Sequence, residues 1–263
     1  MKLTFLGTGT SHGVPVIGCS CAVCSSTDPR NARLRCSVLI EDGGTTIVVD
    51  TGPEFRIQAL RAGLKRLDAV VLTHAHADHL HGLDDVRPLT RDQPASLYAS
   101  EAVLTETRNR FPYVFQGSQG GGGIPRLALT PISGPFTVNS ITVTPLPVLH
   151  GTLPILGFRF GPIAYITDCS SVPDETWPLL EGLDILVLNA LRHLPHPTHL
   201  SVNEALQLIG RIRPRRAYLT HFCHDIDHRT LLRELHQRRR AGELTVPTEP
   251  AYDTLVVESQ VEQ

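Results

Sequence analysis

A chain of 263 residues in which 41% are hydrophobic and 19% are charged has the composition of a folded globular protein rather than of a disordered or fibrous one. Its length suffices for one large domain with a full core, so we expect a single domain over residues 1–263. The formal net charge of −2 at pH 7 provides no broad basic field for a polyanion, which favours a small substrate, although nucleic acid stays open because bound metals would add positive charge at a site.

The first residues, 1–7, have the pattern of a strand rather than of a basic stretch followed by an apolar signal core. No apolar run approaches the length that spans a membrane. We therefore expect a cytoplasmic location and no membrane partner. The sequence does not fix the oligomeric state and leaves a homodimer open.

Six cysteines divide into a cluster and three scattered residues. Cys19, Cys21 and Cys24 lie too close together for an ordinary disulfide framework and are better spaced for a metal. We expect the scattered ones to be small buried hydrophobic residues, since free cysteine is among the most buried residue types. These are Cys36, Cys169 and Cys223.

Further along the chain, β-branched runs that end at a histidine or an aspartate are typical of buried strands with polar groups at their ends. These runs cover residues 46–50, 69–74, 141–150, 163–168 and 216–221. Helical patterns lie between them, at residues 54–62, 101–110, 202–211 and 229–240. Ser201 and Glu204 are spaced as a capping box for the third helix. The alternation of strands and helices predicts a layered α/β architecture.

Two segments that contain glycine predict a turn and a loop. Asp42, Gly43 and Gly44 predict a hairpin turn between two strands. Residues 116–125 include the run 120–123 of four glycines, and such a run loses too much backbone entropy to form regular structure. We expect a mobile loop there, and a role as a lid stays open.

Three imidazoles and a carboxylate lie within six residues directly after one of the predicted strands. They are His74, His76, Asp78 and His79. Core packing rarely requires such a set, whereas imidazole nitrogen and carboxylate oxygen are good ligands for zinc, manganese or iron. The segment therefore predicts a metal site.

This stretch resembles the His-x-His-x-Asp-His signature of the metallo-β-lactamase superfamily, and the resemblance covers nearly the whole chain. It implies an α/β fold, a four-layer αββα sandwich with two metals at the mouth of the two sheets. The implied ligands are His74, His76 and His150 for one metal and Asp78, His79 and His221 for the other, with Asp168 between them. Zinc and manganese both accept this ligand set, so the sequence leaves the metal open.

The resemblance also implies hydrolysis by a hydroxide that the two metals activate, so no protein nucleophile is needed. Asp78 and Asp168 would act in catalysis as ligands of these metals. Asp50 stands at a strand end outside the implied ligand set, and we expect it to orient a ligand histidine.

The cysteine cluster narrows the choice within the superfamily. Cys19, Cys21 and Cys24 supply three ligands for a tetrahedral structural zinc, and His224 is the best candidate for the fourth. This combination resembles the cyclic-phosphate phosphodiesterases of bacterial phosphonate utilisation. The expected function is therefore a phosphodiesterase that acts on small cyclic phosphates or nucleotides.

The same resemblance assigns the role of general acid to His199, because a histidine can protonate an alkoxide leaving group near neutral pH. His193 and His196 are nearby alternatives. Arg192 and His12 are candidate contacts for the phosphate. Two other enzyme classes share the scaffold and stay open: tRNA processing of the ribonuclease Z type, although no basic arm is evident, and hydrolysis of thioesters or lactams.

Overall fold

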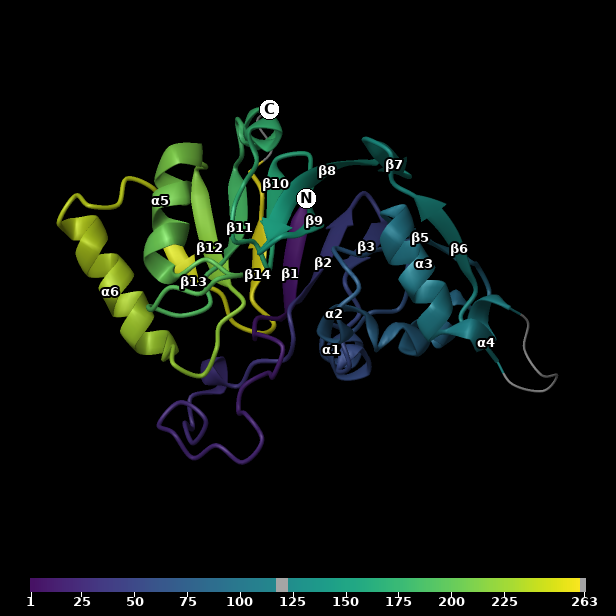
Figure 1. Cartoon of the computed structure of the whole chain (residues 1–263), viewed down its shortest axis with the longest axis horizontal. Coiled ribbons are helices and arrows are strands. Elements are labelled where there is room, and N and C mark those ends of the chain that lie inside the picture. The colour runs from purple at the N-terminus through teal and green to yellow at the C-terminus, as the bar shows by residue number, and fades with distance from the viewer. Residues whose placement is uncertain (117–122, 261–263) are drawn as a thin grey trace.

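The computed structural model describes residues 1–116 and 123–260. Within this part of the chain, the strands form two seven-stranded sheets, and helices cover the outer faces of both (Figure 1). The expected four-layer αββα sandwich is confirmed. The expected loop at residues 116–125 lies mostly outside the described residues, because 117–122 are not among them.

The first sheet comes mainly from the N-terminal half of the chain, with its last strand at one edge. Its order is β14 (Val256–Glu258), β1 (Lys2–Gly7), β2 (Ser37–Asp42), β3 (Thr45–Val49), β4 (Ala69–Val71), β5 (Ala95–Ala99) and β6 (Leu127–Pro131). Strands β3 to β6 are parallel, so their carboxyl ends share one edge of the sheet. The hairpin turn between β2 and β3 is confirmed, because Asp42 pairs with Thr45 and both intervening glycines have positive φ.

The second sheet comes from the C-terminal half. Its order is β13 (Thr248–Pro250), β12 (Arg216–Thr220), β11 (Ile185–Asn189), β10 (Ile163–Ile166), β9 (Leu153–Phe160), β8 (Ile141–His150) and β7 (Phe136–Val138). Strands β10 to β13 are parallel and again bring their carboxyl ends to one edge. In open α/β sheets, ligands bind outside such carboxyl ends.

The helices form the two outer layers (Figure 1). They are α1 (Phe55–Arg61), α2 (Ala77–Leu80), α3 (Glu101–Arg110), α4 (Pro112–Phe115), α5 (Val202–Ile212) and α6 (His228–Arg240), with 3-10 turns η1 (Pro29–Asn31), η2 (Leu83–Thr90) and η3 (Asp174–Leu180). The expected capping box of α5 is confirmed, with Ser201 and Glu204 bonded reciprocally. Within the described residues, none of the helices is long and apolar enough to cross a membrane.

Three hydrophobic clusters hold the layers together. One fills the space between the sheets and includes Phe5, Ile47, Phe158 and Tyr165, all fully buried. The other two lie between each sheet and its helices. Burying one such side chain stabilises the fold by about 1.5–3 kcal/mol, so the inter-sheet cluster fixes the sheets relative to each other.

The strands end earlier than the sequence predicted. β3, β10 and β12 stop before Asp50, Asp168 and His221 instead of including them. These three residues have left-handed backbone, with φ of 62°, 56° and 63°. Strand residues have strongly negative φ, so each polar residue begins a sharp turn out of the ladder.

Candidate functional site

Five polar residues meet at the carboxyl ends of strands from both sheets. Asp50 follows β3 and His74 follows β4 in the first sheet, while His150 ends β8, Asp168 follows β10 and His221 follows β12 in the second. Left-handed backbone at a residue other than glycine costs on the order of 1–3 kcal/mol and persists only where the surroundings hold it. Three of the six such residues in the described chain belong to this group, which marks the edge as a functional site.

The short helix α2 completes the group. His76 is its N-cap, and Asp78 and His79 lie within it. The helix lies directly against the end of β3, where the N–H of Thr51 donates to the carbonyl of His79 (2.7 Å). A Cβ at Gly52 would overlap the carbonyl oxygen of Asp78, so this close approach requires glycine.

Ligand atoms of these residues crowd together. Nε2 of His74 lies 2.9 Å from Nδ1 of His76. Three sets have ligand atoms within 4.8 Å of one another: His74, His76 and His150; His74, His79 and Asp168; and His150, Asp168 and His199. Each set could hold a metal ion, and all seven residues of the implied ligand set lie in or beside them.

Asp168 occupies the middle of the cluster. Its Oδ2 lies 3.3 Å from Nε2 of His79 and 3.3 Å from Nδ1 of His221. Asp78 is connected to the cluster through His79, since its Oδ2 lies 3.2 Å from Nε2 of that histidine. This central place agrees with the position between two metals that the resemblance implied for Asp168.

Hydrogen bonds on the outer side of two rings direct the opposite nitrogen inward. Nδ1 of His79 lies 2.7 Å from Oδ2 of Asp50, and Nδ1 of His150 lies 2.8 Å from the carbonyl oxygen of Thr198. Both partners accept, so Nδ1 carries a proton in each ring, and Nε2 is the nitrogen left to bind a metal once it holds no proton. Asp50 therefore lies where it was expected, against a histidine of the group.

The donor set suits divalent cations. Nε2 of His79 and Nε2 of His221 are buried and have no hydrogen-bond partner among the described residues. Buried polar atoms are normally satisfied, and an unpaired nitrogen beside carboxylates is accounted for by a metal ion. The residues present therefore fit a metal centre.

The charges of the cluster depend on one another. Burial alone would lower the pKa of His79, but Asp168, Asp50 and Asp78 hold it well above its ordinary value. Burial alone would raise the pKa of Asp168, but His221 and His79 hold it well below its usual range. In the protein alone, a proton on His79 offsets the carboxylates, a role that a divalent cation fills equally well.

His199 links the cluster to a pocket of about 330 Å³. Its Nδ1 is buried without a hydrogen-bond partner in the described chain and lies 4.0 Å from Oδ1 of Asp168. Burial, and then His221, lower the pKa of His199 to about 3. The pocket is also lined by His12 and Arg192, which are the expected phosphate contacts, and by His196, which is an alternative general acid.

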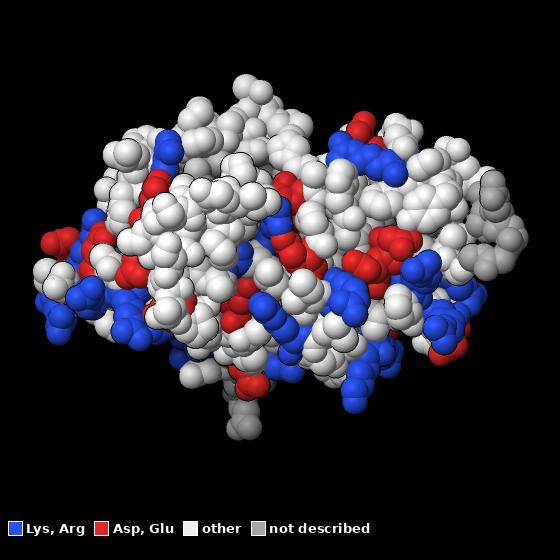
Figure 2. Space-filling view, turned by 90° about the horizontal axis from the view of Figure 1, so that it is seen from below, with Lys and Arg blue, Asp and Glu red and all other residues white. Residues whose placement is uncertain are grey.

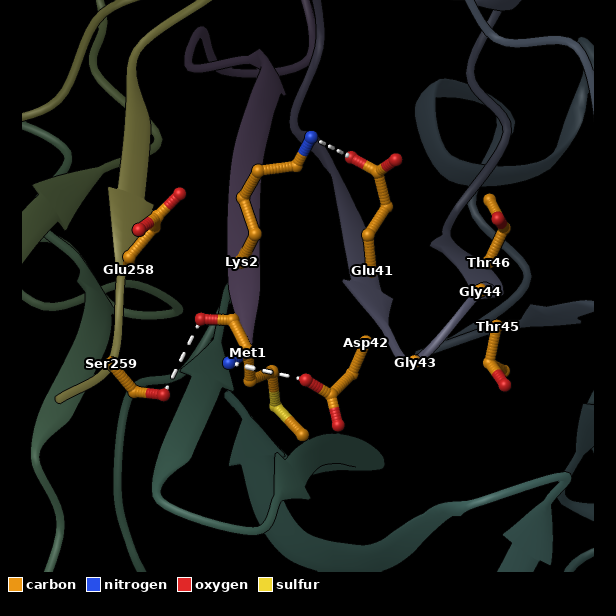
Figure 3. Close-up of a pocket in the computed structure, with 10 residues that line it drawn as sticks. All are labelled: Met1, Lys2, Glu41, Asp42, Gly43, Gly44, Thr45, Thr46, Glu258 and Ser259. Carbon is orange, nitrogen blue, oxygen red and sulfur yellow. Dashed lines mark hydrogen bonds and ion pairs between the residues drawn. The ribbon is translucent and has the colours of Figure 1, made fainter. Parts of the chain in front are cut away.

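A hollow of similar size lies far from this chemistry. It has about 390 Å³ and is lined by Met1, Asp42 and Ser259 (Figure 3). Asp42 pairs with Thr45 at the start of β3, whereas Asp50 follows the other end of that strand. In this hollow, the ion pair between the N-terminal amine and Asp42 closes the β2–β3 turn against β1. Volume alone therefore does not identify the functional site of this fold.

The cysteine cluster forms a second potential metal site. The sulfurs of Cys19, Cys21 and Cys24 lie 3.3, 3.6 and 3.6 Å from Nδ1 of His224. The N–H of Val16 donates to the sulfur of Cys24 and the N–H of Cys24 to that of Cys21. This backbone bond, opposed by burial, lowers the pKa of Cys21 to about 6. The structure thus brings together the four residues that the sequence analysis had grouped as one metal site.

One expectation for the scattered cysteines was wrong. Cys36 and Cys169 are buried, but Cys223 is only half-buried and lines the pocket beside His199. Its N–H bonds to the carbonyl of Leu191, which holds it in the loop after β12 rather than in the core. His193 lies apart, half-exposed, with Nε2 3.7 Å from Glu234.

Residues 45–222 match the beta-lactamase superfamily domain. The chain belongs to the metallo-β-lactamase superfamily. A crystal structure described as a new diphosphatase from the PhnP family is 41% identical, with a TM-score of 0.88, and the match covers 99% of this chain and 98% of that one. At this identity over nearly the full length, the chain belongs to the PhnP family as well.

Two other relatives mark how far the likeness extends. An octanoyltransferase of Porphyromonas gingivalis is 42% identical over 228 residues, 85% of this chain but 46% of that protein, so this chain spans about half of that relative's length. Zinc-bound PqqB from Methylobacterium extorquens has a TM-score of 0.77 at 19% identity, covering 98% of this chain and 100% of that one, and it shows the shared fold. The metallo-β-lactamase fold implies divalent metals.

Sequence reasoning missed several residues that support this metallo-β-lactamase site. Arg33 is 1% exposed and donates to the carbonyls of Cys223 (3.3 Å) and Ile226 (2.8 Å), tying the loop after β12 to the segment before β2. Thr73 and Thr167 bond to members of the cluster. The only signal in the sequence was that each threonine directly precedes a candidate ligand.

Proposed function

We propose that the chain is a metal-dependent phosphodiesterase that hydrolyses small cyclic phosphates or nucleotides. The observation that carries this proposal is the position of His199. It belongs to a group with His150 and Asp168 that could hold a metal ion, and it also lines the neighbouring pocket. A phosphodiester held at the cluster would thus meet a proton donor on the pocket side. The relative that is 41% identical is described as a diphosphatase, which also favours phosphate chemistry for this chain.

In this proposal, two cations occupy the histidine and aspartate cluster. His74, His76 and His150 would hold one, Asp78, His79 and His221 the other, and Asp168 would contact both. When bound, two such cations supply Lewis-acid activation of water and of the phosphoryl oxygens. Zinc and manganese both fit the donor atoms.

His199 would protonate the leaving oxygen. Burial lowers the pKa of His199, so the neutral ring dominates in the protein alone. A phosphodiester carries a negative charge, and a neighbouring negative charge favours the protonated imidazole, as Asp168 already does to a smaller extent. The substrate would therefore help to charge its own proton donor.

Arg192 and His12 would contact the phosphate or the leaving group from the pocket wall. The guanidinium of Arg192 donates to the carbonyls of Leu194 (3.3 Å) and Pro195 (3.2 Å), which limits its orientations. On the face that Figure 2 shows, Lys and Arg lie among Asp and Glu instead of forming one basic field. This distribution favours a small substrate over tRNA.

Cys19, Cys21, Cys24 and His224 would hold a separate structural zinc. Four ligands close a tetrahedral site, whereas a catalytic zinc keeps one position open. The backbone N–H groups that point at the sulfurs favour thiolates.

A panel of substrates tests the proposed function. The full-length protein, loaded with zinc or with manganese, would be assayed on bis-p-nitrophenyl phosphate, cyclic nucleotides, cyclic ribose phosphates, precursor tRNA and lactoylglutathione. We expect turnover of the phosphodiesters and none of the thioester. Turnover confined to tRNA would favour the ribonuclease Z alternative, and turnover confined to the thioester would favour acyl chemistry.

A further inference from the structure

Three buried threonines directly precede three residues of the cluster. Thr73 precedes His74, Thr167 precedes Asp168, and Thr220 precedes His221. Each threonine is at most 1% exposed. In the sequence the three are equivalent, since each is the last residue before a candidate ligand at a strand end.

Thr73 bonds to two members of the first sheet's group. Its hydroxyl donates to Oδ2 of Asp50 (2.8 Å), and its oxygen lies 2.9 Å from Nδ1 of His74. Its backbone N–H donates to Oδ1 of the same aspartate (2.8 Å). The hydroxyl has one proton and donates it in the hydrogen bond to the carboxylate. Its oxygen can therefore only accept a hydrogen bond from Nδ1–H of His74.

Thr167 repeats this arrangement in the second sheet. Its hydroxyl donates to Oδ2 of Asp168 (2.6 Å), and its oxygen lies 3.3 Å from Nδ1 of His221. The same proton count applies, so His221 carries its proton on Nδ1. Nε2 of His221, buried and without a hydrogen-bond partner among the described residues, then presents a bare lone pair.

Thr220 behaves differently. Its hydroxyl lies 3.5 Å from the sulfur of Cys36, and among the described residues it makes no hydrogen bond to a ligand atom of the cluster. Thr220 is as buried as Thr167 and directly precedes His221 in the chain. It therefore provides a matched control for burial and for position before a ligand.

We propose that Thr73 and Thr167 are a pair of positioning residues, one in each sheet, that orient the metal ligands, whereas Thr220 only packs. Through a single hydroxyl, each contributes to the tautomer of one histidine and the rotamer of one carboxylate, and at His221 Oδ2 of Asp168 is a second acceptor (3.3 Å). This inference rests on the proposed metal centre. Hydrogen bonds of this kind typically change metal affinity by about 10- to 100-fold.

Chelator competition on the metal-loaded protein tests the pair. Full-length protein loaded with zinc would be titrated with a chromophoric chelator, and the zinc retained at each chelator concentration would be measured. We expect Thr167→Val and Thr73→Val to release zinc at about 10- to 100-fold lower chelator concentration than the unchanged protein. Thr220→Val should release zinc at the same chelator concentration as the unchanged protein. The one equivalent of zinc held at the cysteine cluster should be retained equally in every variant.

Two further variants keep the test decisive if a valine variant does not fold. Thr167→Ser and Thr167→Ala both remove the methyl group, but only serine keeps the hydroxyl. Serine should restore retention and alanine should not. Equal retention by these two, or an equal loss in Thr220→Val, would overturn the inference. If the unchanged protein retains zinc only at the cysteines, the proposed metal centre itself fails, which is a distinct result.

Discussion

The histidine and aspartate cluster and the cysteine cluster share a loop but are built on opposite principles. The first draws residues from both sheets and from α2, and its central residues Asp168 and His79 are nearly or fully buried. The second takes three ligand candidates from one short segment, all half-exposed, and one from a distant loop, His224. One site depends on the whole fold, and the other is largely local.

This contrast suggests a catalytic role for the first site and a structural role for the second. Within the described part of the chain, the first cluster has ring nitrogens without a hydrogen-bond partner, and it adjoins a pocket, as a site that must admit a substrate does. In the second, three sulfurs and one imidazole nitrogen offer the four ligands of a tetrahedral site, so a zinc held there would keep no position open for a reactant. Four predictions test this division, in order of decreasing effect.

Replacing Asp168 should have the largest effect. Asp168→Asn removes the charge that would contact both metals but tolerates the left-handed backbone found there. We expect turnover of every phosphodiester to fall on the order of 10³-fold or more while the circular dichroism spectrum is retained. Cys169→Ala, the next residue and a buried thiol outside the cluster, is the control and should stay active. Normal turnover in Asp168→Asn would remove this residue from catalysis.

His199→Ala should separate substrates by leaving group. Alkyl and cyclic phosphodiesters need a proton on the departing oxygen and should slow by on the order of 10²- to 10⁴-fold, whereas p-nitrophenyl esters should slow far less. Metal content should be unchanged. Parallel kinetics with His196→Ala test the alternative general acid from the same pocket. Equal losses on both ester types would assign His199 to substrate positioning instead.

Replacing a cysteine should act on stability more than on chemistry. Cys21→Ala should lose about one equivalent of metal and several degrees of melting temperature, since about 1 kcal/mol corresponds to roughly 2–4 °C in proteins of nearly this size. Turnover per folded molecule should change less than in Asp168→Asn. Cys223→Ala, a nearby half-buried cysteine outside the cluster, should keep its metal. Unchanged metal content and melting temperature in Cys21→Ala would contradict a structural zinc.

The smallest expected effect concerns pH and the support of the cysteine segment. Burial, and then Arg30 and Arg33, lower the pKa of His228 to about 4, below its ordinary value in the unfolded chain. The unfolded chain then binds more protons between these values, so stability is lost as the pH falls from about 6.5 towards 4, by at most about 1.4 kcal/mol per unit.

His228→Gln should lessen that dependence. Melting temperatures of both proteins at pH 7, 6 and 5 would be compared, and the unchanged protein should lose more across this range. Parallel slopes would show that His228 does not titrate differently in the folded state. The backbone N–H of His228, which donates to Asn31 (2.9 Å), is kept in the variant.

Much of the fold and of the site could be predicted because the signals are local. His74, His76, Asp78 and His79 lie within six residues, and β-branched runs placed the strands that lead to the site. The match of Cys19, Cys21 and Cys24 with His224 followed from the need for a fourth zinc ligand and from the place of His224 three residues beyond His221. It crosses some 200 positions, for which spacing within the chain gives no information.

The remainder depends on geometry that the sequence does not encode locally. The left-handed turn at Asp168 comes from its neighbours, so the strand was predicted too long. Thr167 and Thr220 look alike in sequence, and only the relative placement of β10 and β12 decides which hydroxyl meets a ligand atom. The half-buried position of Cys223 likewise follows from a loop path that hydrophobicity does not reveal.

Ligand candidates from both sheets meet in one cluster, so bound metals would act as a clasp between the two halves of the sandwich. His74 comes from the first sheet and His150 from the second, and pulling the sheets apart would break both attachments. A ligand held only by the folded state stabilises it by about 2.7 kcal/mol at a hundred times its dissociation constant. The cohesion of the sandwich would then rise and fall with the supply of metal, and resistance to proteolysis would report that supply without any substrate being turned over.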